Sequence, residues 1–366
     1  MTWDGGMRLR SARQARGFSQ QQLAGMAGVS RQAVSAVESG HSDPSLRVAL
    51  ALALALGMTV EEVFGPGSPP AEVKAKPVAE LGGYGARATL APVGDTLVAL
   101  PLAGDTATRA GFLPAGGLAG RQPGKVRPIG PQRPTLVVAG CDPALPLLEA
   151  PLALLDPPVA FAWWPCGSEQ ALRLAAAGLV HAAGAHLRDQ AGNDYNAQQA
   201  RALLGGRGAE VIGFSAWREG LALAPRLAGT AKGVHDVARL GLRLVNREPG
   251  AEARQVLDRE VARLGLEPAA LAGYDTRARG HLQVTAAIAA GLADAGVSAE
   301  PAALAYGLPF VPLADERFDL VIPHAQAESR EVQAMLRVLS SPWLAAQLES
   351  LPGYDASPCG EHVATL

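Results

Sequence analysis

From residue 134 onward, short apolar runs alternate with Ala- and Leu-rich stretches, and this alternation limits the folds that are open to the chain. The runs include TLVVAG, VAFAWW and EVIGFS, and stretches with helical periodicity lie between them. Short buried strands that alternate with helices are typical of βα units around a mostly parallel sheet. We therefore predict that residues 134–366 form an α/β domain.

The N-terminal part has a different pattern, in which short helical periods are separated by single glycines. Ser19 and Gln22 have the spacing of a capping box that starts a helix. Gly28 is suited to end that helix in a left-handed turn, and Ser30 can cap a second helix. We predict a small all-α domain over residues 6–65.

Two segments connect these parts. The run GPGSPPAEVKAKP is rich in Pro and Gly and has no apolar periodicity, which predicts a linker over residues 66–80. The runs ATLAPV and TLVALPLA are short and β-like, with Gly and Pro breaks around them. They predict a small β connector over residues 81–133.

Composition excludes several classes of protein. With 32 Lys and Arg against 34 Asp and Glu, any affinity for nucleic acid must come from a local surface. The three cysteines are too few for a disulfide framework. The longest apolar run, residues 48–56, is far shorter than a membrane span, and the N-terminus has no apolar signal segment. We expect a cytoplasmic protein that does not contact the membrane.

The motifs of common enzyme classes are absent from the sequence. It contains no phosphate-binding loop, no GxSxG elbow, no HExxH and no Cys-x-x-Cys. We therefore expect a protein that is not an enzyme and that has no certain cofactor.

The segment RSARQARGFSQQQLAGMAGVSRQAVSAVESGHSDPSLRVALALALALGMTVEEVF resembles the helix-turn-helix domain of the phage-repressor type, the XRE/Cro–cI family. The resemblance implies that a helix starting after Ser30 enters the major groove of a double-stranded DNA operator. It also implies a homodimer, because members bind inverted half-sites and this chain carries one copy. The residues expected at the DNA are Gln20, Gln21, Arg31, Gln32, Ser35 and Ser39, of which Gln20 and Ser39 lie near phosphates.

The run from residue 137 to 363 resembles the periplasmic-binding-protein-like domain that is fused to helix-turn-helix modules and is akin to molybdate-binding proteins. Segments that carry the resemblance include CDPALPLL, GSEQALRL, NREPGAEARQVLD and FVPLADERFDLVIP. It implies two α/β lobes around a ligand, with lobe 1 at about 134–222 and 320–366 and lobe 2 at about 223–319. Two strands are expected to cross between the lobes near Leu221–Pro225 and Phe318–Pro323. The predicted fold is thus an all-α helix-turn-helix domain, a small β connector and an α/β two-lobed domain.

This resemblance implies a small anionic ligand, either molybdate or tungstate or a molecule like the molybdenum cofactor. Strand ends that open helices leave free N–H groups, which favour anions. The chain departs from the relatives at two such places, where Gly140-Cys141-Asp142 replaces Ser-His-Asp and the stretch before Arg254 lacks hydroxyls and contains Glu252. The candidate ligand-binding residues are Cys141, Asp142, Gly167, Ser168, His186, Tyr195, Arg247, Arg254, His281 and Asp294.

Two alternatives remain open for the large domain. Cys141 and Cys166 both follow strands, and together with His186 they could bind a soft metal or report oxidation. Alternatively, the solute-binding fold serves only to form the dimer. The main hypothesis is a ligand-responsive transcription regulator, in which closure of the lobes on a small molecule moves the DNA-reading helices.

Overall fold

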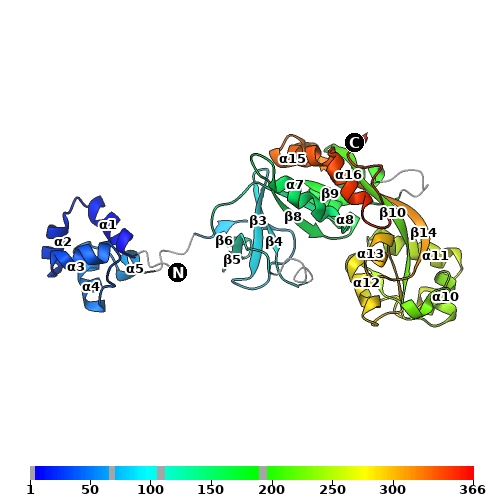
Figure 1. Ribbon diagram of the computed structural model, residues 1–366, viewed down its shortest axis with the longest axis horizontal. Coiled ribbons are helices and arrows are strands. Elements are labelled where there is room, and N and C mark those ends of the chain that lie inside the picture. The colour runs from blue at the N-terminus through cyan, green and yellow to red at the C-terminus, as the bar shows by residue number, and fades with distance from the viewer. Residues whose placement is uncertain (1–4, 66–70, 105–111, 189–195) are drawn as a thin grey trace. The chain divides into compact units, whose positions relative to one another are not determined.

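The computed structural model describes residues 5–65, 71–104, 112–188 and 196–366. The chain divides into two compact units, and the division falls between Val73 and Lys74 (Figure 1). Within the described ranges, no helix combines the length and the apolar character needed to cross a membrane.

Unit 1 is a set of short helices around one apolar core. The capping box is confirmed, because the Ser19 hydroxyl accepts from the Gln22 N–H and the Gln22 side chain accepts from the Ser19 N–H. Gly28 ends this helix with a φ of 65°, a conformation that glycine adopts without strain. The helices are α1 Gly5–Ala15, α2 Gln20–Ala27, α3 Arg31–Glu38, α4 Leu46–Ala55 and α5 Val60–Val63. Their core includes Leu9, Leu23, Val34, Val37, Leu52 and Leu56.

Unit 2 begins with a small six-stranded sheet in the order β1-β6-β5-β3-β4-β2. The sheet starts earlier than the predicted connector, because β1 and β2 lie inside the segment predicted as a linker. Each has two residues and sits at an edge of the sheet, so neither is long enough to show an alternating pattern. The strands are β1 Val73–Lys74, β2 Lys76–Pro77, β3 Arg87–Val93, β4 Thr96–Pro101, β5 Gly117–Ala119 and β6 Lys125–Pro128.

The large sheet of unit 2 has eight strands, with a central path β13-β10-β14-β9-β7-β8. The strands β7, β8 and β9 run parallel, as predicted, whereas β10 and β14 are long and antiparallel to each other. The sheet is therefore mixed. Its strands are β7 Thr135–Gly140, β8 Ala160–Pro165, β9 Ala182–Ala185, β10 Ala209–Leu223, β13 Ala295–Ala299, β14 Phe310–Pro323, β15 Tyr354–Asp355 and β16 His362–Thr365, and β11 Asn246–Arg247 pairs with β12 Arg277–Ala278 separately.

Helices flank this sheet in two groups, which define two lobes. We call the part around β7, β8 and β9 lobe 1 and the part around β13 lobe 2. Helices of lobe 1 are α7 Glu149–Ala153, α8 Ser168–Ala176, α9 Ala197–Leu204, α14 His324–Ala327, α15 Arg330–Leu339 and α16 Pro342–Glu349. Helices of lobe 2 are α10 Val234–Arg239, α11 Glu252–Arg263, α12 His281–Ala289 and α13 Glu300–Ala305. Short 3-10 helices occur at Leu145–Leu148, Pro225–Leu227 and Pro268–Ala270.

The strands β10 and β14 pass from one lobe to the other, as two crossing strands were expected to do. Phe214 and Phe318 belong to a core of lobe 1, whereas Leu221 and Val311 pack in the core of lobe 2. The register of the pair shifts between Glu219 and Gly220. The crossing therefore lies between residues 217 and 221 of β10 and between residues 311 and 318 of β14, so the predicted Leu221–Pro225 lies in lobe 2 and the predicted Phe318–Pro323 lies in lobe 1.

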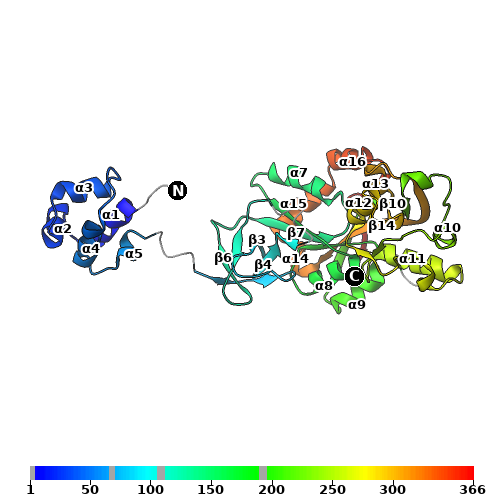
Figure 2. The ribbon, with the colours of Figure 1, turned by 90° about the horizontal axis from the view of Figure 1, so that it is seen from below.

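The small sheet packs on lobe 1. Val93, Val98 and Leu100 of the small sheet share one apolar core with Val137 and Ala139 of β7. Both ribbon views show β3 next to the strands of lobe 1 (Figures 1 and 2). The segment that follows residues 66–70 is thus fixed to this lobe.

Candidate ligand site and DNA-reading surface

The helix α3 of unit 1 presents the residues that were expected at DNA bases. Arg31, Gln32 and Ser35 are exposed, and Ser39 is exposed at the end of the helix. The Ser30 hydroxyl caps the helix by accepting from the Ala33 N–H at 3.1 Å. This cap fixes the start of α3, whose N-terminal residues are the ones that a recognition helix inserts into the major groove.

Gln20 has a partner within unit 1. Its side-chain amide donates to Glu38 Oε2 at 2.9 Å, and the same carboxylate accepts from Arg13 Nε through Oε1 at 2.6 Å. Burial opposes the ionisation of Glu38, but the bonds from Arg13 and Gln20 lower its pKa. Glu38 therefore links α1, α2 and α3. Gln21 is exposed.

In unit 2, ionisable side chains from both lobes gather around the crossing strands, and nearly all of them are fully buried. We call this group the interlobe cluster. Lobe 1 contributes the residues that follow β7 and β9, the crossing strands contribute two carboxylates, and lobe 2 contributes the starts of α11 and α12 and one residue of β11. The members are Cys141, His186, Glu219, Arg247, Glu252, His281 and Glu316.

Cys141 and His186 form the lobe 1 side of the cluster. His186 Nε2 lies 3.1 Å from Cys141 Sγ. The sequence predicted His186 near Cys141 and Cys166, and the structure places it beside Cys141 because both residues follow neighbouring parallel strands. Trp217 packs beside the imidazole, with 5.4 Å between ring centroids. Although burial acts in the opposite direction, Cys141, Glu316 and Glu219 raise the pKa of His186 well above its ordinary value.

His281 forms the lobe 2 side of the cluster. Its Nδ1 accepts from the Ala299 N–H at 3.1 Å, so the neutral ring carries its proton on Nε2. That Nε2 is buried and has no hydrogen-bond partner. Burial and the nearby Arg247 lower the pKa of His281 well below its ordinary value. The guanidinium of Arg247 is itself paired with Glu248 at 2.9 Å.

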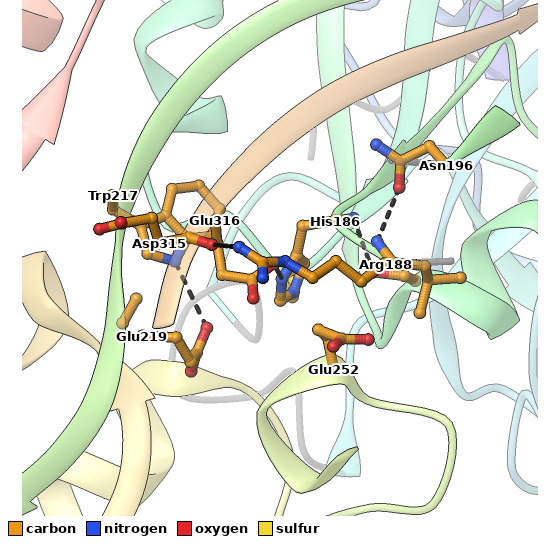
Figure 3. Close-up of polar contacts among 12 residues, drawn as sticks. His186, Arg188, Asn196, Trp217, Glu219, Glu252, Asp315 and Glu316 are labelled. Carbon is orange, nitrogen blue, oxygen red and sulfur yellow. Dashed lines mark hydrogen bonds and ion pairs between the residues drawn. The ribbon is translucent and has the colours of Figure 1, made fainter. Parts of the chain in front are cut away.

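Three carboxyl groups line the cluster (Figure 3), and one of them, Glu252, forms an ion pair with Arg259 at 2.6 Å. Neither oxygen of Glu316 has a hydrogen-bond partner, and one oxygen each of Glu219 and Glu252 also lacks one. Burial raises the pKa of Glu219 to about 7 and raises that of Glu252. Unpaired buried carboxylates are costly, so the cluster is suited to a ligand that brings positive charge or donors.

Sequence reasoning missed Glu219 and Glu316. Both lie in strands that carry further charged residues, so nothing in the sequence set them apart. Their meeting depends on the antiparallel pairing of β10 with β14, in which Trp217 lies opposite Glu316. That pairing joins residues about one hundred positions apart, which periodicity alone does not reveal.

Several predicted ligand residues have structural roles instead. Asp142 accepts from the Ala144 N–H, the Ser215 hydroxyl and the Tyr354 hydroxyl, and it is wholly buried in lobe 1. Asp294 binds Arg226 and Arg243 in lobe 2, apart from the cluster. We expected an anion site at these strand ends, but local hydrogen bonds already use both carboxylates.

Two further predicted residues, Ser168 and Arg254, lie beside members of the cluster. Gly167 caps α8, and the buried Ser168 hydroxyl accepts from the His186 N–H at 3.2 Å. Arg254 donates to the Arg247 carbonyl at 3.3 Å and stacks on Tyr274. Tyr195 lies outside the described residues.

The metal alternative is changed by the structure. Among the described residues, the group whose ligand atoms lie within 4.8 Å of one another is Cys141, His186 and His281. Cys166 is not in this group, although it is buried and follows β8. The alternative drawn from the sequence named Cys141, Cys166 and His186, whereas His281, from the other lobe, was named only among the candidates for an anionic ligand.

Two pockets open at the interface of the lobes. One, of about 660 Å³, is lined by residues of α8, α9 and α11 that include Gln199 and Arg259, and by Arg188, which follows β9. The other, of about 600 Å³, is lined by Cys166, Glu248 and residues of the small sheet. The interlobe cluster lines neither pocket, so in this structure the lobes are closed over it.

Comparisons with known proteins match both units. A family model described as a PBP superfamily domain matches residues 150–340, and a helix-turn-helix model matches residues 9–63. The uncharacterized protein YvgK of Bacillus subtilis (strain 168) is 31% identical over 176 residues, which are 48% of this chain and 56% of YvgK. The chain thus spans about half the length of that relative.

Two further similarities cover the separate units. The uncharacterized HTH-type transcriptional regulator MJ0272 of Methanocaldococcus jannaschii is 39% identical over 57 residues, which are 16% of this chain and 86% of that protein. The solved periplasmic molybdate-binding protein of Azotobacter vinelandii is 18% identical, with a TM-score of 0.47, over 60% of this chain and 98% of its own. Both resemblances seen in the sequence are confirmed at the level of the family. The chain belongs to the PBP superfamily domain family and carries an XRE-type helix-turn-helix domain at its N-terminus.

Proposed function

We propose that this protein is a DNA-binding transcription regulator that senses a small ligand between the lobes of unit 2. The observation that carries the proposal is the interlobe cluster, in which buried polar atoms of His281, Glu219 and Glu316 lack partners. Such atoms cost free energy unless a bound molecule satisfies them. Binding, and not catalysis, is the role that this arrangement supports.

We expect ligand binding to change DNA binding because of how the chain connects to the two-lobed part. The small sheet after residues 66–70 shares its core with lobe 1, while lobe 2 contributes His281 to the cluster. A ligand that prefers one arrangement of the lobes shifts the population toward it. We infer that this shift alters how two DNA-reading units in a dimer are presented to the operator.

The charge of the cluster bears on the ligand. A molybdate or tungstate ion would face Glu219 and Glu316, and the guanidinium of Arg247 is already paired with Glu248. Like charges in a buried site repel strongly. The anionic ligand predicted from the sequence therefore stays a prediction that this charge balance disfavours.

A dimer is part of the proposal. On α4, Leu46, Leu50 and Leu54 follow one another at intervals of four residues, and their exposed fractions are 72%, 53% and 82%. Residues four apart lie on the same face of a helix. We infer that this apolar face packs against the same face of a second copy of the chain.

The proposal is tested by selecting bound sequences from a randomised DNA pool with the full chain and then measuring affinity by fluorescence anisotropy. Gln32→Ala should weaken binding to the selected DNA about tenfold or more, because a good base contact contributes about 1–3 kcal/mol. Gln347→Ala on α16 is the control and should leave the affinity unchanged. A failure to enrich any sequence, or equal binding by Gln32→Ala, would contradict the proposed reading helix.

A further inference from the structure

The interlobe cluster contains one sulfur and two imidazoles in the arrangement of a metal site. The ligand atoms of Cys141, His186 and His281 lie within 4.8 Å of one another, and all three side chains are buried. Thiolate and imidazole are the ligands that zinc and other soft or borderline cations prefer. The composition of this group thus points to a cation.

Each residue is placed by a regular element. Cys141 follows Gly140 at the end of β7, where a Cβ on the glycine would come within 3.1 Å of Gly184. His186 follows β9, and His281 is the first residue of α12. Sites built on strand and helix ends hold their ligands more precisely than sites on free loops.

Each of the two histidines has a carboxylate oxygen near its Nδ1 atom. Glu316 Oε2 lies 3.6 Å from His186 Nδ1, and Glu219 Oε1 lies 3.6 Å from His281 Nδ1. In metal sites, the histidine nitrogen that does not bind the metal usually donates to such a carboxylate, which fixes the ring and makes it a better ligand. The orphaned oxygens of Glu219 and Glu316 are explained by this role.

We propose that Cys141, His186 and His281 together bind a single zinc-like divalent cation between the two lobes. The cation supplies the positive charge that the surrounding carboxylates lack. It also gives the unpartnered His281 Nε2 a partner.

Protons must leave or move when the cation binds. The Cys141 thiol binds as the thiolate, and His186 Nε2, which lies 3.1 Å from Cys141 Sγ, must also be free of its proton, so the protons of this pair are released to solvent. The His281 proton passes from Nε2 to Nδ1, with the ring turned away from two donors, the Ala299 N–H and the Arg247 guanidinium at 3.3 Å, toward the carboxylate of Glu219. The fourth position of the cation is left for water or for a small ligand.

The site joins the lobes, since Cys141 and His186 belong to lobe 1 and His281 to lobe 2. Bound metal would therefore favour the closed arrangement. This inference names the ligand class of the proposed function and rests on that function only for its effect on DNA. Metal binding itself can be measured without DNA, so the two proposals fail separately.

The test is a titration of the reduced, metal-free full chain with Co²⁺, followed by displacement with Zn²⁺. We expect a near-ultraviolet sulfur-to-cobalt charge-transfer band that saturates at one Co²⁺ per chain and disappears with Zn²⁺. Cys141→Ser should abolish the band, and His281→Gln should weaken binding at least tenfold. Cys359→Ser is the control and should keep it.

Two outcomes would overturn the inference. One is a wild-type chain that shows no charge-transfer band and no bound metal by elemental analysis. The other is a band that survives in Cys141→Ser but is lost in Cys166→Ser, which would return the site to the three residues expected from the sequence. Circular dichroism of each variant separates loss of metal from loss of fold, and Glu316→Gln, which keeps all three ligands, should still weaken Co²⁺ binding.

Discussion

Gly184 on β9 shows how single residues shape the wall of the interlobe cluster. A Cβ built on Gly184 would lie 2.1 Å from Phe318 Cζ, a distance that packed atoms do not allow. The Phe318 ring lies against His186, with 6.1 Å between ring centroids. The glycine thus makes room for the ring that packs beside the imidazole.

The first prediction follows from this contact. Gly184→Ala should lower the free energy of unfolding by about 1–3 kcal/mol, because overpacking forces Phe318 or the backbone to shift. Urea unfolding followed by tryptophan fluorescence checks this value. The control is Gly233→Ala, because Gly233 has extended backbone and open space around its Cβ position. Equal stability of the two variants would show that Phe318 is not held where the structure places it.

For single residues, local sequence patterns were enough to predict the helix caps but not all members of the interlobe cluster. Ser19 and Gln22 act within one helical turn, so their pairing can be recognised from spacing alone. The rule that parallel strands end at one edge was applied to Cys141 and Cys166, with His186 expected nearby, whereas the structure brings Cys141 to His186. His281 and Glu316 reach the same place through tertiary contacts between lobes, which no local pattern encodes.

At the scale of elements, the apolar face of α4 is the feature that unit 1 leaves uncovered. The second prediction is that the full chain sediments as a dimer and that Leu50→Glu shifts it to a monomer, because a charge opposite its own copy is repelled and desolvated. Analytical ultracentrifugation measures the change. Leu154→Glu, on an exposed position of lobe 1, is the matched control. A wild-type monomer, or a Leu50→Glu dimer of unchanged affinity, would refute the proposed interface.

One carboxylate, that of Glu210 on β10, binds side chains of the C-terminal strand β16, in addition to the backbone pairing of the two strands. Glu210 accepts from His362 Nε2 at 2.8 Å, from the Thr365 hydroxyl at 2.7 Å and from His324 Nε2 at 2.9 Å. These bonds, led by that of His362, lower the pKa of Glu210 to about 2. A carboxyl with a lowered pKa stabilises the fold above its ordinary pKa and loses this effect as the pH falls toward the lowered value.

The third prediction is therefore an acid-sensitive strand. Glu210→Gln, which imitates the protonated carboxyl, should speed hydrogen exchange of residues 363–365 at neutral pH. In the wild type, the protection of these amides should be full near pH 6 and fall between about pH 4.5 and 2. Glu361→Gln is the neighbouring control. Unchanged exchange in Glu210→Gln would mean that backbone pairing alone holds β16.

Among the elements, the strands β7, β8 and β9 were predictable and the edge strands of the small sheet were not. The apolar runs of lobe 1 are continuous because both faces of these strands are buried, with Leu136 and Val138 in one core and Val137 and Ala139 in another. β1 and β2 are held by two-residue pairings at the edges of the small sheet, and Pro77 lies in one of them. Their formation depends on neighbours that lie far along the chain.

The whole molecule combines the proposed DNA-reading unit with a two-lobed unit. Side chains from both lobes form the interlobe cluster. The two-lobed fold was predicted from the order of its segments, whereas the chemistry of the cleft was not. Helix starts and arginines predicted an anionic ligand. In the structure, Arg247 forms an ion pair with Glu248, and the crossing strands place Glu219 and Glu316 in the cluster. The ligand class thus depends on tertiary charge balance and not on motif.

The central claim is that a ligand held in the interlobe cluster changes the affinity of the full chain for DNA. The most direct measurement is the anisotropy midpoint for the selected DNA, with Zn²⁺ and after chelation, in the wild type and in Cys141→Ser. The account predicts a shift of about fivefold or more in the wild type, the usual size of an allosteric coupling, and none in Cys141→Ser. Overlapping wild-type curves, with metal shown to be bound, would contradict it.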